Sequence, residues 1–118
     1  MNKKILIVDD DPAILEVMDI ILTGQSYDVE TSLNGKIFKK LKHIPDLIVL
    51  DVLLSGEDGR EIIKKIRKQT RTKDIPVIMF SAHPSAGKNL IQLGANDFIE
   101  KPFEIEDFLK MVKKNITA

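Results

Sequence analysis

Four short apolar runs in this sequence each end at residues that can take part in metal or phosphate chemistry. The residues that follow these runs are, in chain order, Asp9-Asp10-Asp11, Asp51, Ser81 and Lys101. If the runs are strands of one parallel sheet, their ends meet at its carboxyl edge, where open α/β sheets bind ligands. Carboxylates, a hydroxyl and an ammonium at one edge suit a divalent cation together with a phosphoryl group.

Apolar runs predict the strands that would position these residues. Residues 4–8 and 47–50 are continuous and rich in β-branched side chains, as in strands covered on both faces. The run at 77–80 is similarly apolar, whereas 27–32 and 97–100 are more mixed and predict strands near the sheet edges.

Helical spacing separates the strand-like runs. Residues 12–23 carry an amphipathic stripe, and Asp11-Pro12 suits the cap and first turn of that helix. For Asp11 this capping role is favoured over a metal role. The other predicted helices are one entered from Gly59, one at 105–116, and two with weak apolar stripes at 35–42 and 86–93. Five β/α units in this order predict a three-layer α/β fold with helices on both faces.

Composition limits the protein class. The 118 residues predict one domain with a single sizeable core. Eighteen basic and eighteen acidic residues balance, which argues against non-specific binding to nucleic acid or to a membrane. The absence of cysteine excludes disulfides and thiol catalysis, and no apolar run is long enough to span a bilayer. We therefore expect a cytoplasmic protein.

The chain resembles a receiver domain of two-component response regulators, from Lys3 to the C-terminus. The resemblance rests on four segments in order: ILIVDDDP at 5–12, PDLIVLDVLLSGEDG at 45–59, IPVIMFSA at 75–82 and GANDFIEKPF at 94–103. It implies a doubly wound, flavodoxin-like (βα)5 sandwich with sheet order 2-1-3-4-5. We expect a single receiver domain over residues 1–118, with no output domain.

The resemblance also implies a metal site. Asp9 and Asp10 would hold Mg²⁺ directly or through water, aided by Asp51 and the backbone carbonyl of Leu53. The bare chemistry agrees, because carboxylates within about 4 Å repel one another by a few kcal/mol per pair at an effective dielectric constant of about 20. Hard oxygen ligands at an open edge favour Mg²⁺ as the cation that offsets this repulsion.

The resemblance implies further features of the site. Asp51 would be the nucleophile that accepts the phosphoryl group, Lys101 would neutralise one phosphoryl oxygen, and Ser81 would donate a hydrogen bond to another. Ser81 and Phe98 would form the switch, in which Phe98 rotates inward when Ser81 turns to the phosphoryl group. The Lys101–Pro102 peptide bond would be cis.

Some positions depart from the common family pattern or vary within it. Ser55 stands where a proline usually precedes the glycine, which predicts a less rigid loop after Asp51. Leu53 and His83 flank the acceptor at positions that set the lifetime of the phosphoryl group. The 81–101 segment is slightly shorter than usual and falls on the surface by which receivers bind targets or dimerise.

Three rival functions would require different residues at these positions or a different use of them. A phosphatase of the haloacid-dehalogenase type would want a second acid two residues after Asp51, where Leu53 stands. A flavodoxin-like nucleotide-binding protein would want a phosphate-cradling first loop rather than three aspartates. A pseudo-receiver, acting only as an interaction module without phosphorylation, is the remaining alternative.

The sequence thus predicts a phosphoryl-accepting receiver that catalyses only its own phosphorylation and dephosphorylation. A histidine kinase or phosphotransfer protein would be the donor, docking on the helix at 12–23. Phosphorylation would switch a face around residues 81–108 toward an unidentified protein target, with no direct nucleic-acid or membrane partner. We expect a monomer or a weak, phosphorylation-dependent dimer.

Overall fold

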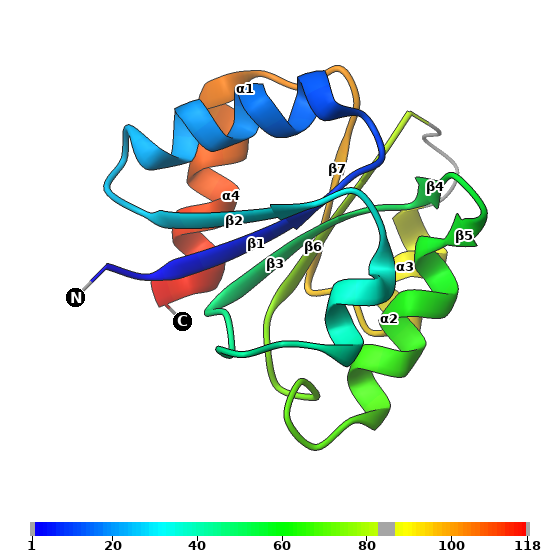
Figure 1. The fold of residues 1–118 in the computed structure, drawn as a ribbon. Helices are drawn as coiled ribbons and strands as arrows, with labels where there is room; N and C mark the ends of the chain where they lie inside the picture. The colour runs from blue at the N-terminus through cyan, green and yellow to red at the C-terminus, as the bar shows by residue number, and fades with distance from the viewer. Residues whose placement is uncertain (1, 83–86, 118) are drawn as a thin grey trace.

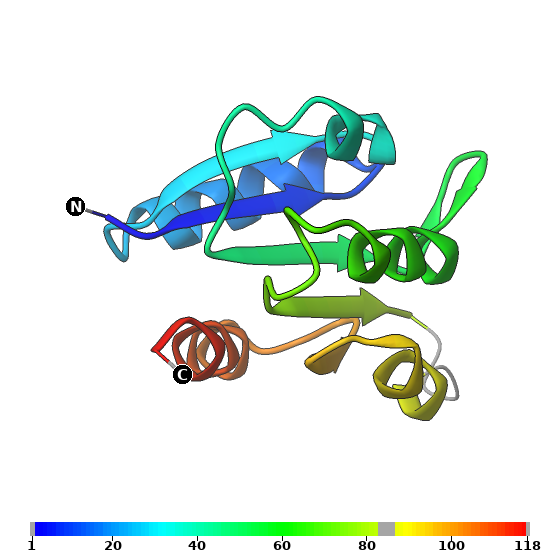
Figure 2. The same cartoon turned by 90° about the horizontal axis from the view of Figure 1, so that it is seen from below.

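The structure is a computed structural model, which describes residues 2–82 and 87–117. Its centre is a parallel sheet of five strands in the order β2-β1-β3-β6-β7 (Figures 1 and 2). The strands are β1 (Lys4–Val8), β2 (Asp28–Ser32), β3 (Leu47–Asp51), β6 (Val77–Ser81) and β7 (Asp97–Glu100). Counting these five strands alone, the order is the predicted 2-1-3-4-5, so the doubly wound fold is confirmed.

Four α-helices cover the two faces of the sheet (Figure 1). They are α1 (Pro12–Thr23), α2 (Gly59–Lys68), α3 (Gly87–Leu93) and α4 (Ile105–Thr117). Helices α1 and α4 bury Met18 and Phe108 against one face, whereas α2 and α3 bury Ile63 and Leu90 against the other. The sheet therefore separates two apolar clusters, as the predicted three-layer arrangement requires. Within the described ranges, no helix is long and apolar enough to cross a membrane.

The start of α1 follows its predicted capping. Asp11 has an extended backbone, and its Oδ1 accepts a hydrogen bond from the Ala13 N–H at 3.0 Å. Pro12 then occupies the first helical position, where its missing N–H costs nothing. The side chain of Asp11 is thereby used to begin the helix.

The segment at 35–42 is not the predicted α-helix. It forms a short 3₁₀-helix, η1 (Gly35–Lys39), capped by Asn34, whose Oδ1 accepts a hydrogen bond from the Lys36 N–H. Phe38 within η1 and Leu41 just after it are the buried apolar residues of the segment. So few apolar contacts support a turn or two, and short segments of this kind commonly take the tighter 3₁₀ form.

A small hairpin that the sequence did not reveal follows the site strand β3. Strands β4 (Leu53–Leu54) and β5 (Glu57–Asp58) pair antiparallel, joined by Ser55 and Gly56. Gly56 has a φ of 74°, a left-handed conformation that glycine adopts without the penalty of a Cβ. Two-residue strands lack the alternating pattern by which strands are found in sequence, so this element appears only in three dimensions.

Gly59, the first residue of α2, lies against the backbone of the site strand. Its N–H donates a hydrogen bond to the Val52 carbonyl at 2.6 Å. A Cβ at this position would overlap the carbonyl oxygen of Asp51 and approach the Val52 Cα to 2.9 Å. Backbone atoms of a buried strand end cannot move aside cheaply, so glycine is required here.

We predict that Gly59→Ala lowers the free energy of unfolding by about 1–3 kcal/mol, the usual cost of overpacking. Urea unfolding monitored by circular dichroism measures this. Gly24→Ala is the control, because Gly24 has a right-handed helical conformation (φ −62°, ψ −19°) that alanine also adopts. Equal stabilities of the two variants would contradict the close approach at Gly59.

Candidate functional site

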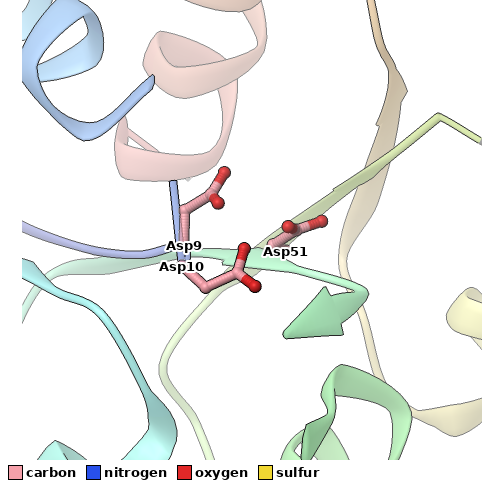
Figure 3. Close-up of side chains that lie close together, drawn as sticks. All are labelled: Asp9, Asp10 and Asp51. Atoms are coloured by element: carbon pink, nitrogen blue, oxygen red, sulfur yellow. The ribbon is translucent and has the colours of Figure 1, made fainter. Parts of the chain in front are cut away.

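Three carboxylates meet at the carboxyl edge of the sheet (Figure 3). Strands β1 and β3 are hydrogen-bonded neighbours in which Val8 lies level with Leu50, so Asp9 and Asp51 leave the sheet side by side. Each of Asp9, Asp10 and Asp51 offers one carboxylate oxygen, and these oxygens all lie within 4.8 Å of one another. The sequence prediction that these residues gather is confirmed.

Lys101 brings the opposite charge into this cluster. Its Nζ lies 3.3 Å from Asp9 Oδ2 and 3.5 Å from Asp51 Oδ2, and it stands 4.5 Å from the centroid of the Phe80 ring. The face of an aromatic ring attracts an ammonium ion, so Phe80 further favours this position. The sequence did not assign Phe80 any part in the site, because an apolar strand residue gives no sign of which cation it will contact.

Ser81 and Lys101 are held together by the backbone. Ser81 ends β6 and lies level with Glu100 of β7, and its carbonyl accepts a hydrogen bond from the Lys101 N–H at 2.8 Å. The side chain of Ser81 is buried. The peptide bond between Lys101 and Pro102 is cis, as the family resemblance implies.

Phe98 lies further back along β7, level with Met79. Its side chain is half-buried and packs against the apolar cluster that β6 shares with α2 and α3. The inward rotation that the family resemblance implies for this ring stays a prediction.

The remaining predicted site residues lie at the edges of the cluster or outside the described part of the chain. Leu53, at the start of β4, is 51% exposed beside Asp51. His83 falls outside the described residues.

Asp10 has a partner that sequence reasoning missed. Its Oδ2 accepts two hydrogen bonds from Ser55, one from the backbone N–H at 2.8 Å and one from the hydroxyl at 2.7 Å. The departure from the family pattern at Ser55 was visible in the sequence. Its contact with Asp10 was not, because the two residues are 45 positions apart.

Burial and crowding change the acidity of the three carboxyl groups in different directions. Burial, with the charge of Asp9 added, raises the pKa of Asp51 from 3.8 to about 6 against the opposing effect of Lys101. Burial also raises the pKa of Asp9, although the Asp11 N–H and Lys101 oppose it. The hydrogen bonds from Ser55 instead lower the pKa of Asp10. One ammonium therefore does not balance the negative charge of this site.

This charge excess fits a bound cation. The donor set is three carboxylates, and burial, with repulsion added, raises the pKa values of two of them, so a divalent ion would favour their charged forms. Asp9, Asp10 and Asp51 are therefore the residues that could hold a metal ion.

The raised pKa of Asp51 predicts how the free energy of unfolding depends on pH when no divalent cation is present. The native state binds the Asp51 proton more tightly than the unfolded chain, so the free energy of unfolding falls as pH rises from 3.8 through about 6. Asp51→Asn removes the titrating carboxyl group and with it this loss of stability. We expect the variant to be more stable than wild type near pH 7.5, by up to about 3 kcal/mol, and the gain to shrink toward pH 4.

Urea unfolding in a chelator at both pH values checks this expectation. Asp10→Asn serves as the contrast, because the pKa of Asp10 is lowered and its charged form favours the folded state. A stability gain for Asp51→Asn that is the same at both pH values would rule out the titration of Asp51 as its cause.

Comparisons with known proteins agree with this geometry. The family model described as response regulator receiver domain matches residues 5–113. A DNA-binding dual master transcriptional regulator, RpaA of Synechocystis sp., is 38% identical over 114 residues, which cover 93% of this chain and 47% of that protein. The chain thus spans about half the length of this relative.

Solved structures have the same fold over nearly the whole chain. The chemotaxis response regulator CheY4 of Vibrio cholerae is 30% identical with a TM-score of 0.88, covering 98% of this chain and 99% of the other. The response regulator TrrA of Thermotoga maritima, solved in complex with Mg²⁺ and BeF, is 31% identical with a TM-score of 0.85, covering 96% and 98%. From the matched family, the shared fold and the acidic edge, we conclude that this chain belongs to the response regulator receiver domain family.

Proposed function

We propose that this receiver accepts a phosphoryl group on Asp51 from a phosphohistidine, in a reaction that requires Mg²⁺. The observation that carries the proposal is the convergence of Asp9, Asp10 and Asp51 with the ammonium of Lys101 at one sheet edge. The complex of the Thermotoga maritima relative with Mg²⁺ and BeF supports the choice of cation.

The metal would be held by Asp9, Asp10 and Asp51, with the backbone carbonyl of Leu53 as a further ligand. When bound, Mg²⁺ neutralises the developing charge on the phosphoryl oxygens. Asp51, whose pKa is otherwise raised to about 6, would be held in its ionised form by the bound cation, and only the carboxylate is a nucleophile.

In the transfer itself, a carboxylate oxygen of Asp51 attacks phosphorus as the phosphorus–nitrogen bond of the donor histidine breaks. The bonding pair of that bond stays on the imidazole, and an acyl phosphate forms on Asp51. Lys101 already lies 3.5 Å from Asp51 Oδ2, so its ammonium can follow the new phosphoryl oxygens. The hydroxyl of Ser81 donates a hydrogen bond to another of these oxygens. Positioning and charge neutralisation are the main sources of catalysis in phosphoryl transfer.

Ser81 and Phe98 would couple phosphorylation to a change in conformation. When the Ser81 hydroxyl turns to the phosphoryl group, the half-buried ring of Phe98 moves further toward the cluster behind it. The face around residues 81–108 then changes its affinity for a protein target. This coupling shifts an existing equilibrium by the difference in affinity between the two states.

Leu53 would affect how long the phosphoryl group persists. It is half exposed and lies two residues after Asp51, where an apolar side chain hinders the approach of attacking water. His83 is proposed for the same role from the family resemblance alone.

The donor would dock on α1. Val17 and Ile20 of this helix are apolar residues that are 55% and 66% exposed, so α1 presents apolar surface to a partner. A groove lined by Ala13, Ile14 and Val17 of α1 continues to Lys101 and Phe103, so it leads toward the acidic edge. A histidine-bearing helix in this groove would bring its phosphoryl group toward Asp51.

The acceptor role is tested by intact-mass measurement after incubation with acetyl phosphate. We expect an adduct of about 80 Da, one phosphoryl group, that requires Mg²⁺ and is absent from Asp51→Asn. Asp46→Asn, a variant at the opposite end of β3, is the control and should be labelled like wild type.

The pseudo-receiver is the alternative outcome of the same experiment. If neither acetyl phosphate nor a phosphorylated histidine donor gives an adduct, the chain acts by capturing partners in its unmodified form. An adduct that persists in Asp51→Asn would instead place the acceptor elsewhere.

The docking role of α1 is tested by Val17→Glu. We predict that transfer from a phosphohistidine domain that phosphorylates wild type slows roughly tenfold or more, because a charge replaces a contact residue. Labelling by acetyl phosphate should not change. Ile44→Glu, at a 42% exposed position in the loop before β3, is the matched control and should leave both reactions unaffected. Slowing by both variants to the same extent would argue against docking on α1.

A further inference from the structure

Asp10 differs from the other two carboxylates of the cluster in how it is held. Asp9 and Asp51 are buried and contact Lys101, whereas Asp10 is only partly buried and follows β1 in the loop before α1. Its carboxylate is fixed by the two hydrogen bonds from Ser55 to Oδ2. We propose that Ser55 is a positioning residue that holds Asp10 in its metal-binding orientation, an inference that rests on the proposed Mg²⁺ site.

The pattern of lone pairs determines which oxygen the cation can use. A carboxylate oxygen has two acceptor sites, and Ser55 occupies two on Oδ2 with its N–H and hydroxyl. Oδ1 is therefore the oxygen that Asp10 presents to a cation. Ser55 makes Asp10 a ligand through one oxygen and fixes which one.

The turn that carries Ser55 is itself anchored. Strands β4 and β5 pair with each other, and Leu54 is buried in the cluster on the α2 side. On the other side of the turn, Glu57 Oε1 accepts a hydrogen bond from the Gly35 N–H at 2.9 Å, which ties the hairpin to η1. Ser55 therefore acts from a fixed position, and the clamp removes rotational freedom from Asp10 before the metal arrives.

Serine supplies donors at this position that proline cannot. Gly56 has a positive φ at the second central position of the turn, and turns of this kind accept proline at the first. A proline at position 55 would fit the turn but would carry neither an N–H nor a hydroxyl. The two hydrogen bonds to Asp10 are thus a property of this chain's serine rather than of the hairpin.

The dissociation constant for Mg²⁺ tests the proposal. It is measured by letting Mg²⁺ displace bound Mn²⁺ and monitoring the Mn²⁺ by electron paramagnetic resonance. We expect Ser55→Ala to weaken Mg²⁺ binding roughly tenfold, the lower end of the usual effect of such supporting residues. Ser55→Pro, which removes both donors, should weaken it at least as much. Ser55→Thr keeps the hydroxyl and should bind like wild type.

Ser32→Ala is the matched control. Ser32 ends β2 at the same edge of the sheet, but its hydroxyl donates to the Asn34 carbonyl and not to a carboxylate of the cluster. This variant should bind Mg²⁺ like wild type. Melting temperatures in a chelator report any purely structural effect of each variant. Wild-type Mg²⁺ affinity in Ser55→Thr would show that the hydroxyl positions Asp10, apart from any effect on folding.

Unchanged or tighter Mg²⁺ binding by Ser55→Ala would overturn the proposal, because Ser55 would then be a bystander or a competitor of the metal. Weakened binding by both alanine and threonine variants would overturn it as well, since the hydroxyl would not be what matters. If wild type itself binds neither Mn²⁺ nor Mg²⁺, the proposed metal site fails and the inference fails with it. Failure of the metal site is therefore distinguishable from failure of the role proposed for Ser55.

Discussion

The site depends on buried negative charge that the protein does not neutralise by itself. Asp9 and Asp51 are almost completely buried at adjacent strand ends, and Lys101 is the cation placed between them. Burial raises the pKa values of both carboxyl groups, with the charge of Asp10 added at Asp9 and the charge of Asp9 added at Asp51, so the charged forms are unfavourable without another cation. The excess negative charge at this edge is what the proposed divalent cation would balance before a phosphoryl group could approach.

Sheet register is what places the charges. Parallel pairing sets Val8 level with Leu50 and Leu50 level with Met79, so the polar residues that end β1, β3 and β6 reach one edge together. A shift of one residue would turn buried apolar side chains to the other face of the sheet, which the two core clusters forbid. The hydrophobic core therefore fixes the geometry of the polar site, and one of its side chains, Phe80, also contacts the Lys101 ammonium.

The hairpin after β3 connects this edge to the rest of that face. Ser55 contacts Asp10, Glu57 contacts the start of η1, and Asp58 caps α2 by accepting a hydrogen bond from the Arg60 N–H. Gly59 then allows α2 to begin directly against the backbone of Asp51. Few residues thus link Asp10, the strand that ends in Asp51 and two helical elements.

Much of this could be predicted from the sequence, because the relevant signals are local. Apolar runs gave the five strands of the main sheet, the spacing at 12–23 gave α1, and Asp11 was correctly expected to cap it. The polar residues that end the strands were visible as one chemical set, since strand ends in a parallel α/β fold meet at one edge. Those features depend on residues near one another in the chain or on a rule of topology.

Only the tertiary structure decided the features that depend on contacts across the chain. The segment at 35–42 became a 3₁₀-helix because its few apolar side chains pack as a short turn. The ring of Phe80 beside Lys101 and the hydrogen bonds of Ser55 to Asp10 join residues that are distant in the chain, and the two-residue strands of the β4–β5 hairpin are too short to show a pattern. The sequence by itself determined which chemical groups the protein possesses and which edge they reach. Packing decided which atoms of those groups face one another, because hydrogen-bond geometry and burial are properties of the assembled chain.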